Sequence, residues 1–468
     1  MNVPKVSVII PTYNGGKLLP EAIQSVLDQT YLDFELIIVN DASPDKTSEI
    51  IAKFNDPRIK YIVHEKNQGV DRSRVTGFRA SRGEIIAFLD QDDFFHPDKL
   101  QSHVEFYEQH PDVDFTYNAR FEMNYSANTI RSLWRPSRNI TLAELVLWFP
   151  IAPSDWVLRR DCAFILADLM DASQRWTGGE IVYLGHLFMS GCTFAFVDRA
   201  LNYRRHHSGR IFKDLSGGCS LEIAAQDKIF DDLRCPQDVL ALHDRAHANI
   251  YMFWAFRAFI QDETYLGQEF VRNAIKHKPT ILIGKPCELA RSLVINCSDD
   301  ENLDHTALMK RVFAQLPKEA AVVSEQYEWA VTQGYLFKGT RAAIWDRTED
   351  ALSYFNQAKQ MEAEIDESFL SHLTRNLLDF EAEFGDLSSR KLLKTLLSYL
   401  KNLESSSSMR QLRGMFALNS AFQNCHLGNY KKVLGRVMQA IVNNPRYITN
   451  YGLMTILFRS IGNSLTKI

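Results

Sequence analysis

The first part of the chain alternates between short apolar runs and longer amphipathic stretches. The apolar runs are rich in Val and Ile and lie at residues 6–10, 35–39, 59–63 and 85–89. Runs this short and this apolar favour strands buried on both faces of a mostly parallel sheet. Helical stretches follow at residues 17–29, 46–55, 70–81 and 97–109. This alternation predicts βαβ units and a doubly wound α/β sheet.

The pattern changes near residue 220, where strand-like runs largely give way to helical periodicity. Three later segments echo one another weakly through small apolar residues at helical spacing, and they lie at 265–279, 345–361 and 429–445. This echo is typical of helix-pair repeats of the tetratricopeptide type, and a plain helical bundle fits it equally well. We therefore predict an α/β domain over residues 1–218 and an all-α domain over residues 219–468.

Charge and cysteine usage narrow the class of protein. A formal net charge of −4 provides no basic field, which argues against nucleic acid as a partner. The seven cysteines are scattered without a C-x-x-C pair, as expected of reduced thiols in a cytosolic protein. The chain starts without a signal-peptide pattern, and no stretch reaches the roughly 18 apolar residues of a transmembrane helix. We expect a cytoplasmic protein, either free or peripheral at the inner face of the membrane.

Ligands of doubly wound sheets bind beyond the carboxyl ends of the strands, so the loops after the apolar runs are the first place to search. The loop at 11–17 (PTYNGGK) matches neither a dinucleotide-binding fingerprint nor a Walker A loop, which also disfavours a nucleotidyltransferase. Asp41, after the second run, can accept a hydrogen bond from a ring N–H. Ser43 and Asp45 in the same loop have a simpler alternative role, which is to cap the next helix.

Three carboxylates follow the fourth apolar run within four residues, at Asp90, Asp92 and Asp93. Carboxylates this close repel one another, and a hard divalent cation such as Mg²⁺ or Mn²⁺ offsets the repulsion and can bridge to phosphates. A solvated acidic turn is the alternative. The position of the cluster at the end of a buried strand favours a metal site.

Five motifs now stand in register along the chain, and they are PTYN at 11–14, NDAS at 40–43, NQG at 67–69, Arg74 and FLDQDD at 88–93. In this order and spacing, residues 4–215 resemble the inverting family 2 glycosyltransferases with a GT-A fold. The resemblance implies a metal-dependent enzyme with a nucleoside-diphosphate sugar as donor. The implied acceptor is a hydroxyl of a glycan, a lipid or a protein.

The resemblance also implies roles for single residues. Those implied to contact the nucleotide and its phosphates are Thr12, Asp41, Asn67, Gly69, Arg74, Asp90 and His207. Among them, Asp41 would contact the ring imide and Asp90 the ribose. Asp92, together with Asp90, would hold the divalent metal, with support from Asp93. For His206 and His207, a basic surface loop after the last strand is the alternative interpretation.

The acceptor half of the family is similar to three further segments of this chain. Residues 155–160 resemble an edge strand, 176–180 the glycine-rich start of the catalytic helix, and 203–207 a basic stretch near the leaving diphosphate. The family usually shows Glu-Asp at that helix start, whereas Glu180 is followed here by Ile181. We take Glu180 as the catalytic base, with Asp155 as the second candidate.

An impaired enzyme is the remaining alternative. The protein would then be a non-catalytic scaffold whose helical half binds a partner. In an active enzyme, we expect the helical half to recruit an acceptor or a protein partner.

Overall fold

The computed structural model describes residues 3–124, 128–148, 151–172, 179–206, 214–299, 304–401, 403 and 406–465. Its contacts divide the chain into two compact units, Met1–Ile281 and Leu282–Ile468. The first unit therefore continues past the predicted boundary at 218/219. It includes the helices α8 (Leu215–Phe230), α9 (Gln237–Leu240), α10 (His243–Ile260) and α11 (Thr264–His277). The predicted boundary between a transferase domain and a helical domain of separate function stays a prediction.

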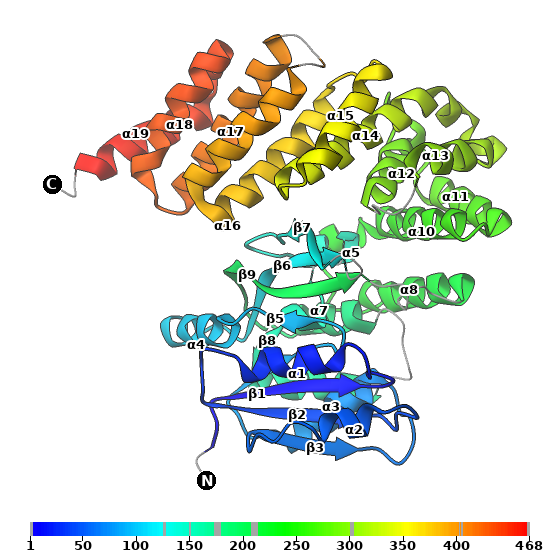
Figure 1. Ribbon diagram of the computed structural model, residues 1–468, viewed down its shortest axis with the longest axis vertical. Helices are drawn as coiled ribbons and strands as arrows, with labels where there is room; N and C mark the ends of the chain where they lie inside the picture. The colour runs from blue at the N-terminus through cyan, green and yellow to red at the C-terminus, as the bar shows by residue number, and fades with distance from the viewer. Residues whose placement is uncertain are drawn as a thin grey trace. The chain divides into compact units, whose positions relative to one another are not determined.

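A nine-stranded sheet forms the centre of the first unit, in the order β3-β2-β1-β4-β8-β6-β9-β5 with β7 paired to β6 (Figure 1). Its parallel part consists of β1 (Val6–Thr12), β2 (Phe34–Asn40), β3 (Ile59–Val63) and β4 (Ile85–Phe88). Strands β1, β2 and β4 are buried along their whole length. The mostly parallel α/β sheet predicted from the apolar runs is confirmed.

Strand β3 departs from the predicted burial. It lies at the edge of the sheet with β2 as its neighbour, and Val63 is 53% exposed. An apolar run predicts a strand, but it does not reveal whether neighbours cover both of its sides. The prediction that this run is buried on both faces is therefore wrong.

The other part of the sheet is mixed. It contains β5 (Phe94–Phe95), β6 (Phe115–Asn124), β7 (Thr129–Trp134), β8 (Val157–Arg159) and β9 (Phe194–His206). Strand β8 pairs in antiparallel fashion with both β4 and β6, so it lies inside the sheet. The prediction of an edge strand over residues 155–160 is therefore wrong. Short β8 instead joins the parallel part to the part that contains β6 and β9.

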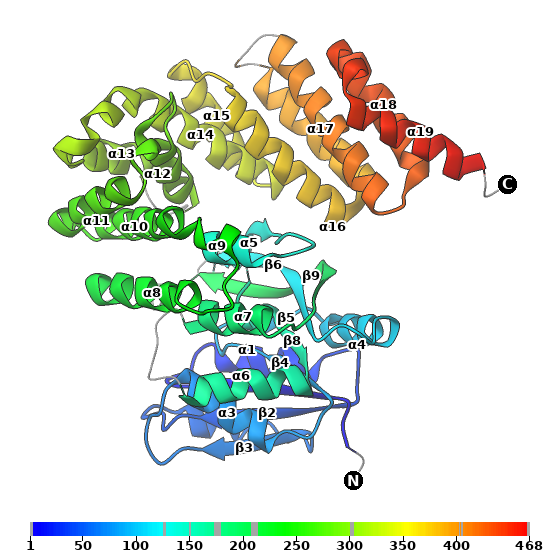
Figure 2. The ribbon, with the colours of Figure 1, turned by 180° about the vertical axis from the view of Figure 1, so that it is seen from behind.

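Helices cover both faces of this sheet. The predicted helices are present as α1 (Leu19–Leu27), α2 (Thr47–Ile51), α3 (Val70–Ala80) and α4 (Lys99–Gln109). Later helices are α5 (Leu142–Trp148), α6 (Arg160–Ala172) and α7 (Gly179–Met189). Helix α1 covers one face in Figure 1, and α3 and α6 cover the opposite face in Figure 2. In the described part of the chain, none of the helices combines the length and hydropathy needed to cross a membrane.

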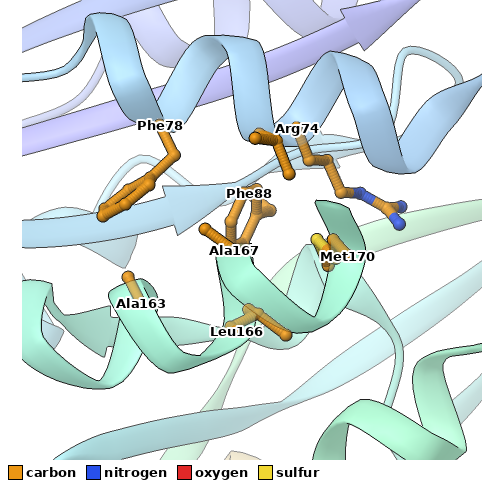
Figure 3. A pocket seen from close by; sticks show the side chains of 8 residues that line it. Arg74, Phe78, Phe88, Ala163, Leu166, Ala167 and Met170 are labelled. Atoms are coloured by element: carbon orange, nitrogen blue, oxygen red, sulfur yellow. The ribbon is translucent and has the colours of Figure 1, made fainter. Parts of the chain in front are cut away.

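Helices α3 and α6 enclose an apolar layer that determines the direction of one charged side chain. Figure 3 shows Phe78, Phe88 and Leu166 packed between the two helices and β4. In the same view the guanidinium of Arg74 points away from this layer. The guanidinium of Arg74 must therefore find its charged partners outside this apolar layer.

The second unit consists of helices. They are α12 (Glu288–Asp299), α13 (His305–Ala314), α14 (Tyr327–Ile344), α15 (Thr348–Gln360), α16 (Glu367–Leu400), α17 (Ser406–His426), α18 (Tyr430–Asn443) and α19 (Tyr451–Leu465). Both ribbon views show α14 to α19 side by side (Figures 1 and 2). The prediction of a helical C-terminal half is confirmed.

The three echoing segments occupy equivalent positions in the structure. They correspond to α11, α15 and α18, each the second helix of a packed pair with α10, α14 and α17. The weak sequence echo therefore marks a recurring helix pair. The tetratricopeptide class of these pairs stays a prediction.

Gly77 of α3 provides a test of the packing on the sheet. A Cβ at this position would lie 2.4 Å from Cγ2 of Ile9 in β1. Because both elements are fixed by their neighbours, Gly77→Ala is expected to lower the free energy of unfolding by about 1–3 kcal/mol. The measurement is denaturant-induced unfolding followed by circular dichroism.

Gly435→Ala in α18 is the matched control, since a Cβ there meets nothing within 4 Å. It should leave stability unchanged or raise it by up to about 1 kcal/mol, because Ala is the better helix former. Equal unfolding curves for the two variants would contradict the close packing of α3 on β1.

Candidate active site at the carboxyl ends of the strands

The loops after β1 and β4 are joined by one side chain, Gln91. Its Oε1 accepts hydrogen bonds from the Thr12 hydroxyl at 2.6 Å and from the Tyr13 N–H at 2.9 Å. Its Nε2 donates to the Tyr13 carbonyl at 3.0 Å. Thr12 itself is 2% exposed. Sequence analysis gave Gln91 no role, because nothing in the sequence shows which backbone atoms lie beside it.

Asp41 holds the loop before α3. Its carboxylate accepts hydrogen bonds from the N–H groups of Gln68 at 2.8 Å and Gly69 at 2.7 Å, and it lies 2.7 Å from Nδ1 of His64. Gly69 has φ +94°, a conformation that favours glycine. Asn67 donates from Nδ2 to the Asp41 carbonyl at 3.4 Å. The structure thus brings together three residues predicted to contact the nucleotide. If the predicted nucleotide binds here, its ring would share the carboxylate oxygens of Asp41 with these backbone N–H donors.

Asp45 contacts the start of the next helix, as the simpler interpretation predicts, whereas the hydroxyl of Ser43 binds the loop after β1 instead. Asp45 Oδ1 accepts a hydrogen bond from the Thr47 N–H at 3.1 Å at the start of α2, and Oδ2 accepts from the Gly16 N–H at 3.2 Å. The Ser43 hydroxyl accepts from the Asn14 N–H at 3.1 Å. These side chains fix the start of α2 and the glycine-containing loop after β1.

The three carboxylates after β4 have different surroundings. Asp93 is 1% exposed and accepts hydrogen bonds from the Ser154 hydroxyl at 2.8 Å and the Arg205 N–H at 3.3 Å. Asp90 and Asp92 are half-buried. Asp93 is therefore anchored in the fold, whereas Asp90 and Asp92 can reach a ligand. Two carboxylates at a strand end are the oxygen donors that Mg²⁺ and Mn²⁺ prefer, so the residues fit the predicted metal.

Arg74 connects this acidic turn to the start of α7. Its Nη2 lies 2.8 Å from Oδ1 of Asp90, and its Nη1 lies 3.2 Å from Asp71 and 3.8 Å from Oε1 of Glu180. Tyr183 of α7 donates to Asp71 at 2.7 Å. Burial alone would lower the pKa of Arg74, but the three carboxylates raise it. Its charge is thus committed to carboxylates, and Asp71 is a partner that sequence analysis missed.

Glu180 is the second residue of α7, and its side chain is 26% exposed. Burial raises the pKa of Glu180 above its ordinary value, Arg74 opposes the rise, and Asp71 and Asp90 add to it. A helix start by itself favours the ionised form and predicts a weak base. The structure reverses that direction, because the desolvation of the carboxylate outweighs the helix start.

Asp155, the second candidate for the base, lies in a buried ion pair. It is 0% exposed and accepts hydrogen bonds from Arg120 at 2.6 Å and from the Ala152 N–H at 2.7 Å. Arg120 also pairs with Glu122 at 2.7 Å. A carboxylate enclosed in this way has no route to an acceptor hydroxyl, which favours Glu180.

The described part of the basic stretch belongs to β9 and is not a surface loop. His206 Nε2 lies 2.6 Å from Glu122 Oε2, and Arg204 lies 3.9 Å from the same carboxylate. Arg205 points elsewhere and pairs with Glu21 at 2.9 Å. His207 and residues 176–178 lie outside the described residues.

The sheet and its acidic turn form an α/β domain with candidate ligand-binding groups at the carboxyl ends of the parallel strands. Residues 7–163 match the family model for glycosyl transferase family 2. An uncharacterized glycosyltransferase of Rickettsia conorii is 40% identical over 134 residues, which cover 28% of this chain and 22% of the relative. One from Rickettsia typhi is 35% identical over 168 residues, covering 36% and 51%. Residues 7–163 are therefore similar to family 2 glycosyltransferases, while the chain spans about a fifth to a half of these relatives.

Two solved structures show a partial likeness. TarS 1–349 of S. aureus in complex with UDP-GlcNAc has 19% identity and a TM-score of 0.44, covering 69% of this chain and 91% of that one. The mannosyltransferase PcManGT of Pyrobaculum calidifontis, in complex with GDP-Man and Mn²⁺, has 15% identity and a TM-score of 0.40, covering 74% and 89%.

Proposed function

We propose that the protein is a metal-dependent inverting glycosyltransferase that uses a nucleoside-diphosphate sugar. The observation that carries the proposal is the position of Arg74 between Asp90 and Glu180. Asp90 belongs to the proposed donor site, and Glu180 is the proposed base. One buried guanidinium thus holds together the two groups that a single displacement requires.

The donor would bind across the loops after β1, β2 and β4. Thr12, Asp41, Asn67 and Gly69 would surround the nucleotide, and Asp90 and Asp92 would hold Mg²⁺ or Mn²⁺. A bound divalent cation supplies positive charge beside the diphosphate. The partly exposed Arg204 and His206 of β9 would add to that charge. His207 remains a proposed phosphate contact.

The acceptor would approach at the start of α7. Glu180 would take the proton of the acceptor hydroxyl as the oxygen forms its bond to the anomeric carbon, while the bond from that carbon to the diphosphate oxygen breaks. Attack from the face opposite the leaving group inverts the anomeric configuration. The raised pKa of Glu180 makes it a stronger base than an ordinary glutamate. Arg74 would keep its carboxylate in place.

The scaffold alternative rests on Ile181, which stands where the family usually has an aspartate. In this structure Ile181 is 7% exposed and packs into the core. Its neighbour Glu180 is the one that lies within ion-pair distance of Arg74. The burial of Ile181 supports a catalytic role for Glu180, and turnover of a nucleotide sugar separates the two interpretations.

We also propose that the helical unit binds a negatively charged part of the acceptor. A cavity of about 510 Å³ in this unit is lined by five cations, Arg390, Lys394, Lys401, Arg413 and Arg436. This size is typical of ligand sites.

Only part of that positive charge is neutralised by the carboxylates described around the cavity. Arg436 pairs with Glu381 at 2.8 Å and Asp386 at 2.6 Å, and Arg390 pairs with Asp386 at 2.9 Å. Cations therefore outnumber these carboxylates at the cavity, which favours phosphate, sulfate or carboxylate groups as ligands.

Asp92→Asn tests the donor site. The change removes one proposed metal ligand at a half-buried position, so the fold should persist while metal-dependent donor affinity falls by at least about tenfold. A thermal-shift screen of UDP-, GDP-, dTDP- and CDP-sugars in Mn²⁺ first identifies the nucleotide sugar that raises the melting temperature most. The affinity for that sugar is then measured by isothermal titration calorimetry. The exposed Asp161→Asn is the control. Equal affinity in Asp92→Asn would contradict the metal assignment.

Glu180→Gln tests the base. It keeps the size of the side chain and is expected to lower the transfer rate by about 10²–10⁴ with donor affinity little changed. In the wild type the rate should fall as the pH falls through the pKa of Glu180. That decline should begin above the range of an ordinary glutamate, about 4.3. Glu180→Gln should lack this decline.

Glu108→Gln, at an exposed position on α4, provides the control for the base experiment. It should keep both the rate and the pH profile of the wild type. Transfer by Glu180→Gln within a fewfold of wild type would show that Glu180 only fixes the start of α7.

A Lys394→Glu/Arg413→Glu double variant tests the cavity of the helical unit. Electrophoretic retardation by dextran sulfate should be lost in this variant, because two cations become carboxylates, while donor hydrolysis stays unchanged. Lys310→Glu, at an exposed position on α13, controls for net charge, and neutral dextran controls for the polymer. Equal retardation of the double variant and Lys310→Glu would contradict an anion site.

A further inference from the structure

The first unit contains a second cluster of metal-ligating side chains, on helices and not at the strand ends. Asp227 of α8 faces His243 and His247 of α10, and one ligand atom of each lies within 4.8 Å of the others. Oδ1 of Asp227 is 2.9 Å from Nε2 of His247 and 3.4 Å from Nε2 of His243. The cluster therefore joins two helices that are separate in the chain.

These distances are close to those of ligands that share one ion. Zinc binds His nitrogen and carboxylate oxygen at about 2.0–2.2 Å, so ligand atoms at the corners of a tetrahedron lie roughly 3.3 Å apart. His243 and His247 are four residues apart on α10, which places both rings on one face of the helix. A small movement of the side chains would centre an ion between the three ligand atoms.

His247 carries the observation that distinguishes this cluster from a simple ion pair. The residue is 4% exposed, and its Nε2 contacts Oδ1 of Asp227 at 2.9 Å, an oxygen that it shares with Nε2 of His243 at 3.4 Å. Two imidazole nitrogens thus converge on a single carboxylate oxygen, which is the arrangement of ligand atoms around one shared ion. An ion between these nitrogens and the carboxylate would contact all three groups.

The neighbours of the cluster orient its rings as in known metal sites. Oδ1 of Asp244 lies 3.4 Å from Nδ1 of His243 and 3.0 Å from Nδ1 of His277. Carboxylates commonly hold the far nitrogen of a metal-bound histidine in this way. The ring centroid of His277 is 5.1 Å from that of His247. His277 thus lies beside the cluster but is not one of the three residues whose ligand atoms lie within 4.8 Å of one another.

We propose that Asp227, His243 and His247 form a transition-metal site that ties α8 to α10. Two imidazoles and one carboxylate suit Zn²⁺ better than Mg²⁺ or Mn²⁺, which prefer oxygen ligands. The site is thus chemically distinct from the all-carboxylate pair Asp90 and Asp92. Because the ion would bridge two helices, its binding stabilises the folded first unit.

The test titrates Zn²⁺ alone into metal-free full-length protein by calorimetry, in an Asp92→Asn background that weakens metal binding at the proposed donor site. One equivalent should bind and raise the melting temperature. His243→Gln and Asp227→Asn alter half-exposed ligands, and each should weaken this binding by at least about tenfold. His426→Gln, at an exposed position on α17, is the control and should bind as the parent does. Titration with Co²⁺ should add visible d–d absorption that His243→Gln lacks.

The proposal is overturned if no equivalent of Zn²⁺ binds, or if both ligand variants bind Zn²⁺ with the affinity of the His426→Gln control. Circular dichroism of the metal-free variants checks that they fold. Because donor turnover by protein with an intact Asp92 is measured separately, failure of this site leaves the proposed transferase activity unaffected.

Discussion

Arg74 is a guanidinium with only 2% of its side chain exposed, and its burial depends on the carboxylates around it. Removing one partner of a buried ion pair commonly costs about 3–5 kcal/mol, since the other charge stays in a poor environment. The carboxylates depend on Arg74 in the same way. Without Arg74, the carboxylates of Asp71, Asp90 and Glu180 would face one another with their main positive neighbour gone. The strand end and the start of α7 therefore depend on one cation.

A second buried cation lies beside the mixed part of the sheet, and here the effect of burial outweighs that of the nearby carboxylate. Lys99 is 0% exposed, and burial lowers its pKa to about 7, with Asp155 opposing the shift. Its ammonium donates to Asn118 at 2.5 Å and to the Ser154 carbonyl at 3.0 Å. The Ser154 hydroxyl donates in turn to Asp93. Buried polar groups thus connect the interior of the sheet to the acidic turn, which fixes Asp93 while its neighbours stay accessible.

The sequence was sufficient to predict the elements and the motif-bearing loops, because periodicity reports burial along the chain. It could not predict the order of the strands, so β3 was expected to be covered on both sides and residues 155–160 to form an edge. Likewise Gln91 and Asp71 had no recognisable signal, since their partners come from other loops. The direction of the pKa shift of Glu180 has the same origin: the helix start is visible in the sequence, but the burial of the side chain is not.

The departure at Ile181 shows why a motif and a site need separate arguments. A motif compares neighbouring letters, whereas consecutive helix positions point in directions about 100° apart. In α7, one of the two positions lies near Arg74 and the other packs into the core. An aspartate at position 181 would therefore be buried and would need a polar or charged partner of its own. Ile181 is apolar and needs none. Of these two positions, only 180 places a carboxylate within ion-pair distance of Arg74, and this is why we propose Glu180 and not residue 181 as the base.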